Sequence, residues 1–164
     1  MQTSRLELVH LTEDHLLGYF SICKDPEATK WSGHGPCNNL EAAEEWMSEL
    51  SPEVNPKGEN YAVLLRQDLD PKSIEALKQK REHSRVPELG FVFHRDAWGL
   101  GFATEALTAC KEVHWQARPE FDVLEAWCDT ENKASANPQK VWIRLCRGRL
   151  RWLPSPMDDF SFTE

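Results

Sequence analysis

A glycine-bearing turn that opens directly into a helix is encoded by Trp98-Gly99-Leu100-Gly101-Phe102-Ala103-Thr104-Glu105-Ala106-Leu107. The turn follows a stretch, 88–93, in which Leu89, Phe91 and Phe93 alternate with other residues, as in a strand with one buried face. Beyond the turn, apolar residues recur at helical spacing through Cys110 and Val113. The sequence therefore predicts a strand, a tight glycine turn and a helix in direct succession.

A turn of this kind can bind phosphate. The first backbone N–H groups of a helix have no partner within it, and the helix dipole adds partial positive charge there. Glycines let a diphosphate approach that backbone closely. Thr104 occupies the last position of the dinucleotide fingerprint G-x-G-x-x-G, and no Gly-Lys-Ser/Thr of a Walker loop occurs. A G-x-G turn by itself is most often only a connection, so both interpretations stand at this point.

The N-terminal half predicts two more strands and two more helices. Leu6 and Leu8 indicate a first, half-buried strand, and 61–65 is a continuous apolar run typical of a buried strand. Thr12 is a plausible N-cap for a helix that ends near Asp25-Pro26. Its expected apolar face consists of Leu16, Leu17, Phe20 and Cys23. Asn39 caps a second helix, whose apolar positions are Leu40, Ala43, Trp46, Met47 and Leu50.

Composition restricts the class of protein. The chain has 164 residues, the size of one domain, and a formal net charge of -8. An acidic surface repels phosphate backbones, which makes nucleic-acid binding unlikely, and it favours cationic partners such as amines. An odd number of cysteines without a C-x-x-C pair argues against a disulfide framework or a zinc site. Without an apolar signal core or a membrane-spanning stretch, we expect a cytoplasmic protein with no membrane partner.

Several motifs in order resemble the GNAT acetyltransferase superfamily. They are residues 87–93, the turn at 98–107 and Asp129-Thr130-Glu131-Asn132-Lys133-Ala134-Ser135. The start of the chain, at 4–8 and 25–27, is similar to the branch that includes ribosomal-protein N-terminal alanine acetyltransferases. The resemblance covers roughly residues 3–66 and 87–137. It implies an α/β (α+β) fold with a mixed, mostly antiparallel sheet flanked by helices.

The resemblance also implies a ligand and a reaction. Acetyl-CoA would be the donor, and a primary amine, in a small molecule or at a peptide N-terminus, would be the acceptor, with no metal. The family's R/Q-x-x-G-x-G/A pyrophosphate loop matches 98–103, where Trp98 departs from the pattern. The residues that would contact acetyl-CoA are Phe91, Val92, Phe93, Trp98, Gly99, Leu100, Gly101, Phe102, Ala103, Thr104 and Asn132.

Two residues are candidates for acid–base chemistry. Glu88 matches the acidic position of the central strand and would be the base that takes the proton of the amine. Ser135 would protonate the leaving sulfur. The alternatives are structural: Glu88 as an exposed charge at the edge of the strand, and Ser135 as a first-turn helix residue above an Asn132 cap.

Two segments depart from the family pattern. The family has a strand between Leu65 and Glu88, but here the charged, helix-prone residues 73–82 predict a solvated helix or a mobile loop. Pro138 would break the helix that follows Ser135. We therefore divide the chain into a GNAT-like domain at 1–137, with an atypical insert at 67–86, and a divergent arginine-rich tail at 138–164.

The departures leave three other functions open. The chain could be a catalytically impaired remnant that binds acyl-CoA, or an interaction module whose turn binds nothing. The arginine-rich tail could also form a weak nucleic-acid patch. Substitute strands for the sheet could come from 141–145 and 150–153, with a hairpin turn at Arg147-Gly148.

Overall fold

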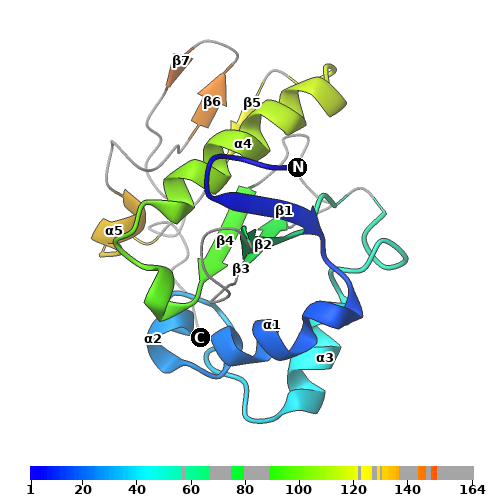
Figure 1. Ribbon diagram of the computed structural model, residues 1–164, viewed down its shortest axis with the longest axis vertical. Coiled ribbons are helices and arrows are strands. Elements are labelled where there is room, and N and C mark those ends of the chain that lie inside the picture. The colour runs from blue at the N-terminus through cyan, green and yellow to red at the C-terminus, as the bar shows by residue number, and fades with distance from the viewer. Residues whose placement is uncertain are drawn as a thin grey trace, which may run out of the picture.

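Two antiparallel sheets form the framework of the protein (Figure 1). The computed structural model describes residues 1–56, 58–66, 75–79, 89–121, 123–126, 129, 131–136, 144–146 and 149–150. The first sheet has the order β1-β2-β3-β4 and consists of Leu6–His10, Tyr61–Leu65, Glu75–Gln79 and Leu89–Phe93. The second has the order β5-β6-β7 and consists of Val123–Glu125, Arg144–Cys146 and Arg149–Leu150.

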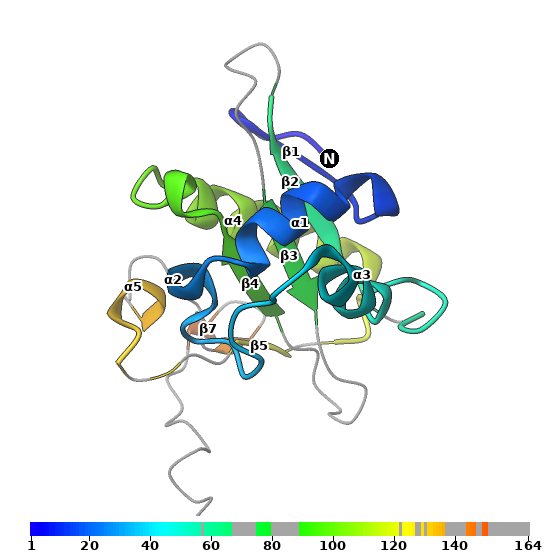
Figure 2. The same cartoon turned by 90° about the horizontal axis from the view of Figure 1, so that it is seen from below.

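Helices cover both faces of the first sheet. The 3-10 turns η1 and η2 span Glu13–His15 and Arg95–Ala97, and the helices α1 to α5 span Leu16–Cys23, Pro26–Thr29, Leu40–Ser48, Phe102–Ala117 and Lys133–Ala136. The long helix α4 lies on one face, while α1 and α3 lie on the other (Figures 1 and 2). This arrangement confirms the predicted α+β fold.

The core between α4 and the sheet forms from the alternation predicted for the strands. Leu6 and Leu8 of β1 are 2% and 1% exposed, and they pack with Val63 and Phe93 against α4. Leu89 and Phe91 contact the same cluster, as their alternation with Phe93 predicted. From α4 the cluster receives Ala106, Leu107 and Cys110. Burying each large apolar side chain contributes about 2 kcal/mol, so this core fixes α4, and with it the preceding turn, on the sheet.

A second apolar cluster joins α1 and α3. It contains Tyr19 and Cys23 of α1, Ala43 and Met47 of α3, and Cys37 before α3. The expected apolar face of α1 was partly wrong, because Leu17 is 72% exposed and the buried positions are Tyr19, Ile22 and Cys23. The helix itself begins at Leu16, after the 3-10 turn η1.

The segment between β2 and β4 differs from our expectation. Residues 73–82 were predicted to be a solvated helix or a loop, but β3 lies there as a strand. It pairs antiparallel with β2, where Ala76 faces Ala62, and with β4, where Ala76 faces Val92. All five residues of β3 pair with β4 and the first three also pair with β2, and these ladder hydrogen bonds outweigh a helix propensity worth only tenths of a kcal/mol per residue. The family's strand is therefore present.

The tail supplies strands to the second sheet instead of the first. Leu145 of β6 faces Leu124 of β5 on one side and Leu150 of β7 on the other. Strands were expected at 141–145 and 150–153, and the structure has them at Arg144–Cys146 and Arg149–Leu150, so their bounds and their sheet differ from the expectation. Residues 141–143, 147–148 and 151–153 lie outside the described residues. Among the residues described here, no helix combines the length and the apolar character needed to cross a bilayer.

Replacing Asn39 with alanine is expected to lower the free energy of unfolding by about 1 kcal/mol, the usual contribution of an N-cap. The Asn39 side chain accepts a hydrogen bond of 2.9 Å from the backbone N–H of Ala42, as the sequence predicted. Urea titration would measure the loss. Asn38→Ala is the matched control, because Asn38 is exposed, adjacent and outside the cap. Equal losses in both variants would contradict the capping role.

Candidate functional site

The strand β4 lies at an edge of the first sheet. It pairs with β3 on one side, and within the described residues no strand pairs with its other side. The next strand in the sequence, β5, belongs to the second sheet. An unpaired strand edge presents backbone N–H and C=O groups to any extended ligand that can pair with it. Phe91, Val92 and Phe93, the residues predicted to face the pantetheine arm, all lie on this strand.

The turn between β4 and α4 depends on two glycines in left-handed conformations. Gly99 has φ of 76° and Gly101 has φ of 80°, a region that L side chains rarely adopt. A Cβ atom at Gly99 would meet nothing within 4 Å. Leu100 and Trp98 are 53% and 47% exposed. The turn is therefore an open surface feature that a ligand can reach.

The N-terminus of α4 is left without a side-chain cap. Gly101 is its N-cap residue and has no side chain to donate or accept. None of the backbone N–H groups from Gly99 to Thr104 donates a hydrogen bond to another residue in the part of the chain that the structure describes. The first internal bond of α4 joins the Glu105 N–H to the Gly101 carbonyl, at 3.1 Å. These amides form a site suited to an anion, and α4 is long enough to add its dipole.

Trp98 fixes the turn to the end of the strand. Its indole Nε1–H donates a hydrogen bond of 3.0 Å to the carbonyl oxygen of Phe93, the last residue of β4. The family has Arg or Gln at the position that Trp98 matches. Here the side chain holds the turn against β4 instead of presenting a charge.

Arg5 and Glu105 clamp the base of the turn to the first strand. The Arg5 Nε donates to Glu105 Oε2 at 2.7 Å, and Arg5 Nη1 donates to the Leu100 carbonyl at 2.9 Å. The guanidinium also lies 4.6 Å from the ring centroid of Phe102. Glu105 accepts further bonds from the hydroxyls of Thr3 and Ser4 and from the Arg5 amide. An acid in the first turn of α4 would repel a bound anion, but this network neutralises its charge.

The same network sets the acidity of Glu105. Burial acts to raise the pKa of this carboxyl, but the hydrogen bonds from Thr3, Arg5 and Ser4 outweigh it and lower the pKa from 4.5 to about 2. The folded state therefore binds the ionised form more strongly than the unfolded chain does. The resulting stability is fully present above pH 4.5 and is lost as the pH falls toward 2.

Replacing Glu105 with glutamine is expected to lower the free energy of unfolding by about 2 kcal/mol at pH 7, because hydrogen bonds to charged groups contribute roughly 1.5–3 kcal/mol. The difference from the wild type should shrink as the pH falls below 4.5. Urea titrations at several pH values measure both effects. Glu112→Gln is the control on the same helix, since Glu112 is exposed. If the free energies of unfolding of the wild type and Glu105→Gln differed by the same amount down to pH 2, the stabilising role of the Arg5–Glu105 clamp would be contradicted.

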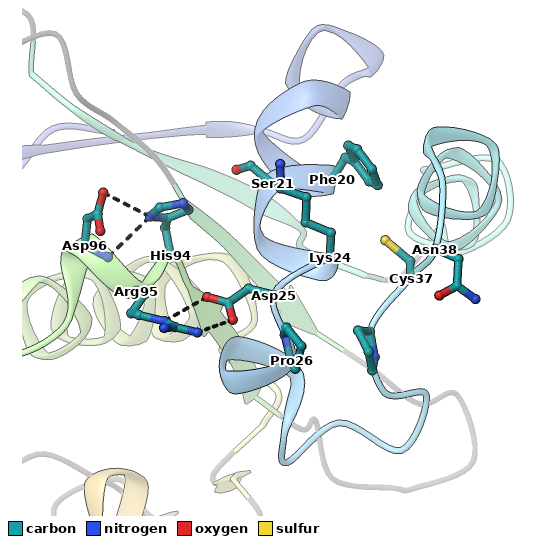
Figure 3. Close-up of a pocket in the computed structure, with 11 residues that line it drawn as sticks. Phe20, Ser21, Lys24, Asp25, Pro26, Cys37, Asn38, His94, Arg95 and Asp96 are labelled. Carbon is teal, nitrogen blue, oxygen red and sulfur yellow. Dashed lines mark hydrogen bonds and ion pairs between the residues drawn. The ribbon is translucent and has the colours of Figure 1, made fainter.

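A hollow of about 790 Å³ opens on the α1 side of the connection between β4 and α4 (Figure 3). One wall is the run from His94 to Asp96, and the opposite walls are the C-terminal end of α1 and the segment around Cys37. Arg95 and Asp25 form a two-pronged ion pair across it, with Arg95 Nε 3.0 Å from Asp25 Oδ2. This hydrogen bond lowers the pKa of Asp25. The pair ties η2 to the N-cap residue of α2.

The remaining predicted residues lie on α5 or outside the described chain. Asn132 Oδ1 accepts a hydrogen bond of 3.1 Å from the Ser135 N–H. Asn132 therefore caps α5, as expected if Ser135 is a residue of the first helical turn. The Ser135 side chain is half-buried. Glu88 lies outside the described residues, directly before β4. Its role and those of Asn132 and Ser135 therefore stay predictions. The described residues contain no cluster of three or more His, Cys, Asp or Glu arranged to hold a metal ion.

Sequence reasoning missed the Arg5–Glu105 clamp and the Asp25–Arg95 pair. Both join residues that are far apart in the chain, so no local spacing indicates them. The available signal was chemical: a carboxylate in the first turn of a helix proposed to hold phosphates requires a cation nearby.

Comparisons with known proteins agree with this geometry. Residues 5–138 match the family described as "Acetyltransferase (GNAT) domain". Spermidine N-acetyltransferase from Vibrio cholerae, solved with CoA and spermine, is similar in structure, with a TM-score of 0.65, 14% identity and coverage of 82% of this chain and 77% of that one. A structure described as a ribosomal-protein-serine acetyltransferase, also from Vibrio cholerae, gives a TM-score of 0.63, 20% identity and coverage of 82% and 76%.

A relative in sequence is the protein YkkB of Bacillus subtilis, which has no assigned function. It is 33% identical over 75 residues, which cover 45% of this chain and 43% of YkkB. The chain thus matches less than half the length of that relative. The two structures show the fold, while the family match covers most of the sequence and includes the turn and β4. The chain belongs to the GNAT acetyltransferase family.

Proposed function

We propose that this protein transfers an acetyl group from acetyl-CoA to a primary amine. The observation that carries the proposal is the group of backbone N–H groups from Gly99 to Thr104, directly after an edge of β4, where the described part of the chain supplies no partner for the amides or for the strand edge. A diphosphate needs several converging donors, and an extended amide-containing arm needs a strand edge. The two features follow each other directly in the chain, as one ligand with both groups requires.

The chain's own residues would hold acetyl-CoA mainly through backbone atoms. The amides at the start of α4 would bind the diphosphate, with Phe102, Ala103 and Thr104 forming the first helical turn. Phe91, Val92 and Phe93 would pair with the pantetheine arm along β4, and Asn132 would lie beside it. This mode of binding explains how an acidic chain can accept a phosphate ligand at a turn that contains no lysine.

Acetyl-CoA supplies the thioester carbonyl that the amine attacks. Glu88 would accept a proton from the amine, directly or through one water, so that its lone pair becomes available. Backbone N–H groups at the edge of β4 would stabilise the negative charge that develops on the carbonyl oxygen. The Ser135 hydroxyl would donate a proton to the departing sulfur. Each of these three steps would use one group of the protein, and none of the steps needs a metal.

The acceptor is proposed to be a cationic primary amine, either a small molecule or a peptide N-terminus. The net charge of -8 favours positively charged acceptors. The two similar structures are named for a polyamine and for a ribosomal protein, which supports including both classes in a test. Resemblance at 4–8 and 25–27 adds ribosomal-protein N-terminal alanine as a specific candidate. A reaction with acceptors of these classes would be consistent with the cytoplasmic location that the sequence predicts.

Two measurements test the proposal. Calorimetry with CoA should give saturable binding, and a thiol-release assay with acetyl-CoA should respond to at least one amine in a panel of polyamines and peptides beginning with Ala or Ser. No heat at millimolar CoA would favour the interaction module. Binding without amine-dependent thiol release would favour the impaired remnant. The presence of β3 removes the missing strand as a reason to expect that outcome.

A further inference from the structure

A second cysteine, Cys23, lies next to Cys37, which is one of the residues that line the hollow. Cys23 is the last residue of α1, and Cys37 lies in the segment that leads into α3. The Cys37 N–H donates a hydrogen bond of 2.8 Å to the Cys23 carbonyl oxygen. With one hydrogen bond of this length between them, standard bond lengths hold the two Cα atoms within about 6.7 Å of each other, and disulfides require roughly 4.4–6.8 Å. The backbone at these two residues is therefore already at bridging distance.

The two side chains also share one buried environment. Both belong to the apolar cluster between α1 and α3, with exposures of 4% for Cys23 and 5% for Cys37. Burial raises the pKa of the Cys37 thiol, and the neighbouring Cys23 side chain acts in the opposite direction. Neither cysteine forms a disulfide in the described structure. The pair is thus in the reduced form, with its backbone at a separation that a disulfide can span.

The hollow gives a small oxidant access to the pair. Cys37 is one of its lining residues, and Figure 3 shows the Cys37 side chain pointing toward α1. Cys110 provides a contrast, because it is buried between α4 and the sheet and burial raises its pKa to about 12. Of the cysteines whose side chains the structure describes, only Cys37 lines this hollow, and Cys23 belongs to the same apolar cluster as Cys37.

We propose that Cys23 and Cys37 form a reversible disulfide, making this wall of the hollow a redox modification site that reacts with low-molecular-weight disulfides such as oxidised glutathione. The Cys37 thiolate attacks one sulfur of the oxidant, forming a mixed disulfide and releasing one glutathione thiol. The Cys23 thiolate then attacks the Cys37 sulfur and releases the second glutathione thiol. Two electrons pass from the cysteine pair to the oxidant, and both cysteine protons appear on glutathione.

The Cys23–Cys37 disulfide would restrict the movement of the intervening segment, which forms one side of the hollow. Residues 24–36 become a closed loop that contains α2 and Asp25, the partner of Arg95. Closing a loop of this size restricts the unfolded chain, which is expected to raise the Tm of the oxidised protein by roughly 6–12 °C. Burial raises the pKa of Cys37, so oxidation should be faster at alkaline pH, where more thiolate is present.

Peptide mapping tests the bridge independently of acetyl transfer. The full chain, with Cys128 and Cys146 changed to serine, is incubated at pH 8.5 with oxidised glutathione, alkylated and digested with trypsin. The expected product joins peptide 6–24 to peptide 31–57 and is lost on reduction. Cys110→Ser in the same background should retain both the joined peptide and the rise in Tm.

Two results would overturn the proposal. One is complete alkylation of Cys23 and Cys37 after oxidation, while the folded protein is otherwise unchanged. The other is a bridge that joins Cys110 to either residue as often as it joins the pair. Cys37→Ser and Cys23→Ser should each abolish the joined peptide. If either variant fails to fold, the peptide map of the protein that retains both cysteines still tests the bridge.

Discussion

Replacing Gly101 with alanine is expected to raise the Kd for CoA by at least about tenfold, which corresponds to roughly 1.4 kcal/mol. Gly101 has φ of 80°, and a left-handed conformation costs an L residue about 1–2 kcal/mol. The chain can relieve this strain by rotating the peptide units on either side. Those units carry amides at the start of α4, so relief of the strain turns the proposed diphosphate donors away from a common point. Calorimetry measures the change.

The strain, and not a clash, is the expected cause. A Cβ atom at Gly101 would lie 3.5 Å from Arg5 Nη2, an ordinary contact, and one at Gly99 would meet nothing within 4 Å. Gly99→Ala, with φ of 76°, should therefore behave like Gly101→Ala. Both variants should also lower the free energy of unfolding by about 1 kcal/mol.

Gly35→Ala is the matched control. Gly35 has φ of 65° and open space around its Cα, so the substitution introduces the same kind of strain away from α4. It should reduce stability by a similar amount and leave the Kd for CoA unchanged. Equal weakening of CoA binding in Gly35→Ala and Gly101→Ala would mean that general destabilisation, and not the turn, controls binding.

Patterns set by nearest neighbours in the sequence were predicted well. The alternation of Leu89, Phe91 and Phe93 indicated β4, and Asn39 indicated the start of α3, because both signals are local. The turn between β4 and α4 followed from its glycines for the same reason. In α1 the sequence pattern is compatible with two different buried faces, and the elements that pack against the helix determine which one is buried. Here α3 and the sheet cover Tyr19 and Ile22 and leave Leu17 in solvent.

Features that depend on distant partners were not predictable in this way. Residues 75–79 contain helix formers, but two neighbouring strands supply backbone partners along both edges, and these pairings determine the structure. The Arg5–Glu105 clamp likewise joins the first strand to the first turn of α4. The sequence indicated that the turn could bind an anion, but not how its own acidic residue is neutralised.

Replacing Glu88 with glutamine is expected to lower kcat/KM for acetyl transfer by at least about 100-fold, because a positioned general base contributes roughly 10²–10⁴ in rate. The Kd for CoA should not change, since the proposed diphosphate and pantetheine contacts are made by backbone atoms. The acidic limb of the pH–rate profile, which reports protonation of the base, should disappear in the variant. Thiol-release kinetics across a range of pH values measure these effects.

Glu53→Gln is the control for Glu88→Gln, because Glu53 is an exposed loop residue whose loss should alter neither rate nor pH profile. Ser135→Ala should lower kcat while keeping α5 intact, since the cap on that helix is made by the Asn132 side chain and the Ser135 backbone N–H. Ser48→Ala tests for a general effect of removing a hydroxyl. Unchanged kcat/KM and an unchanged acidic limb in Glu88→Gln would exclude this residue as the base, because a glutamine side chain cannot accept the proton of the attacking amine.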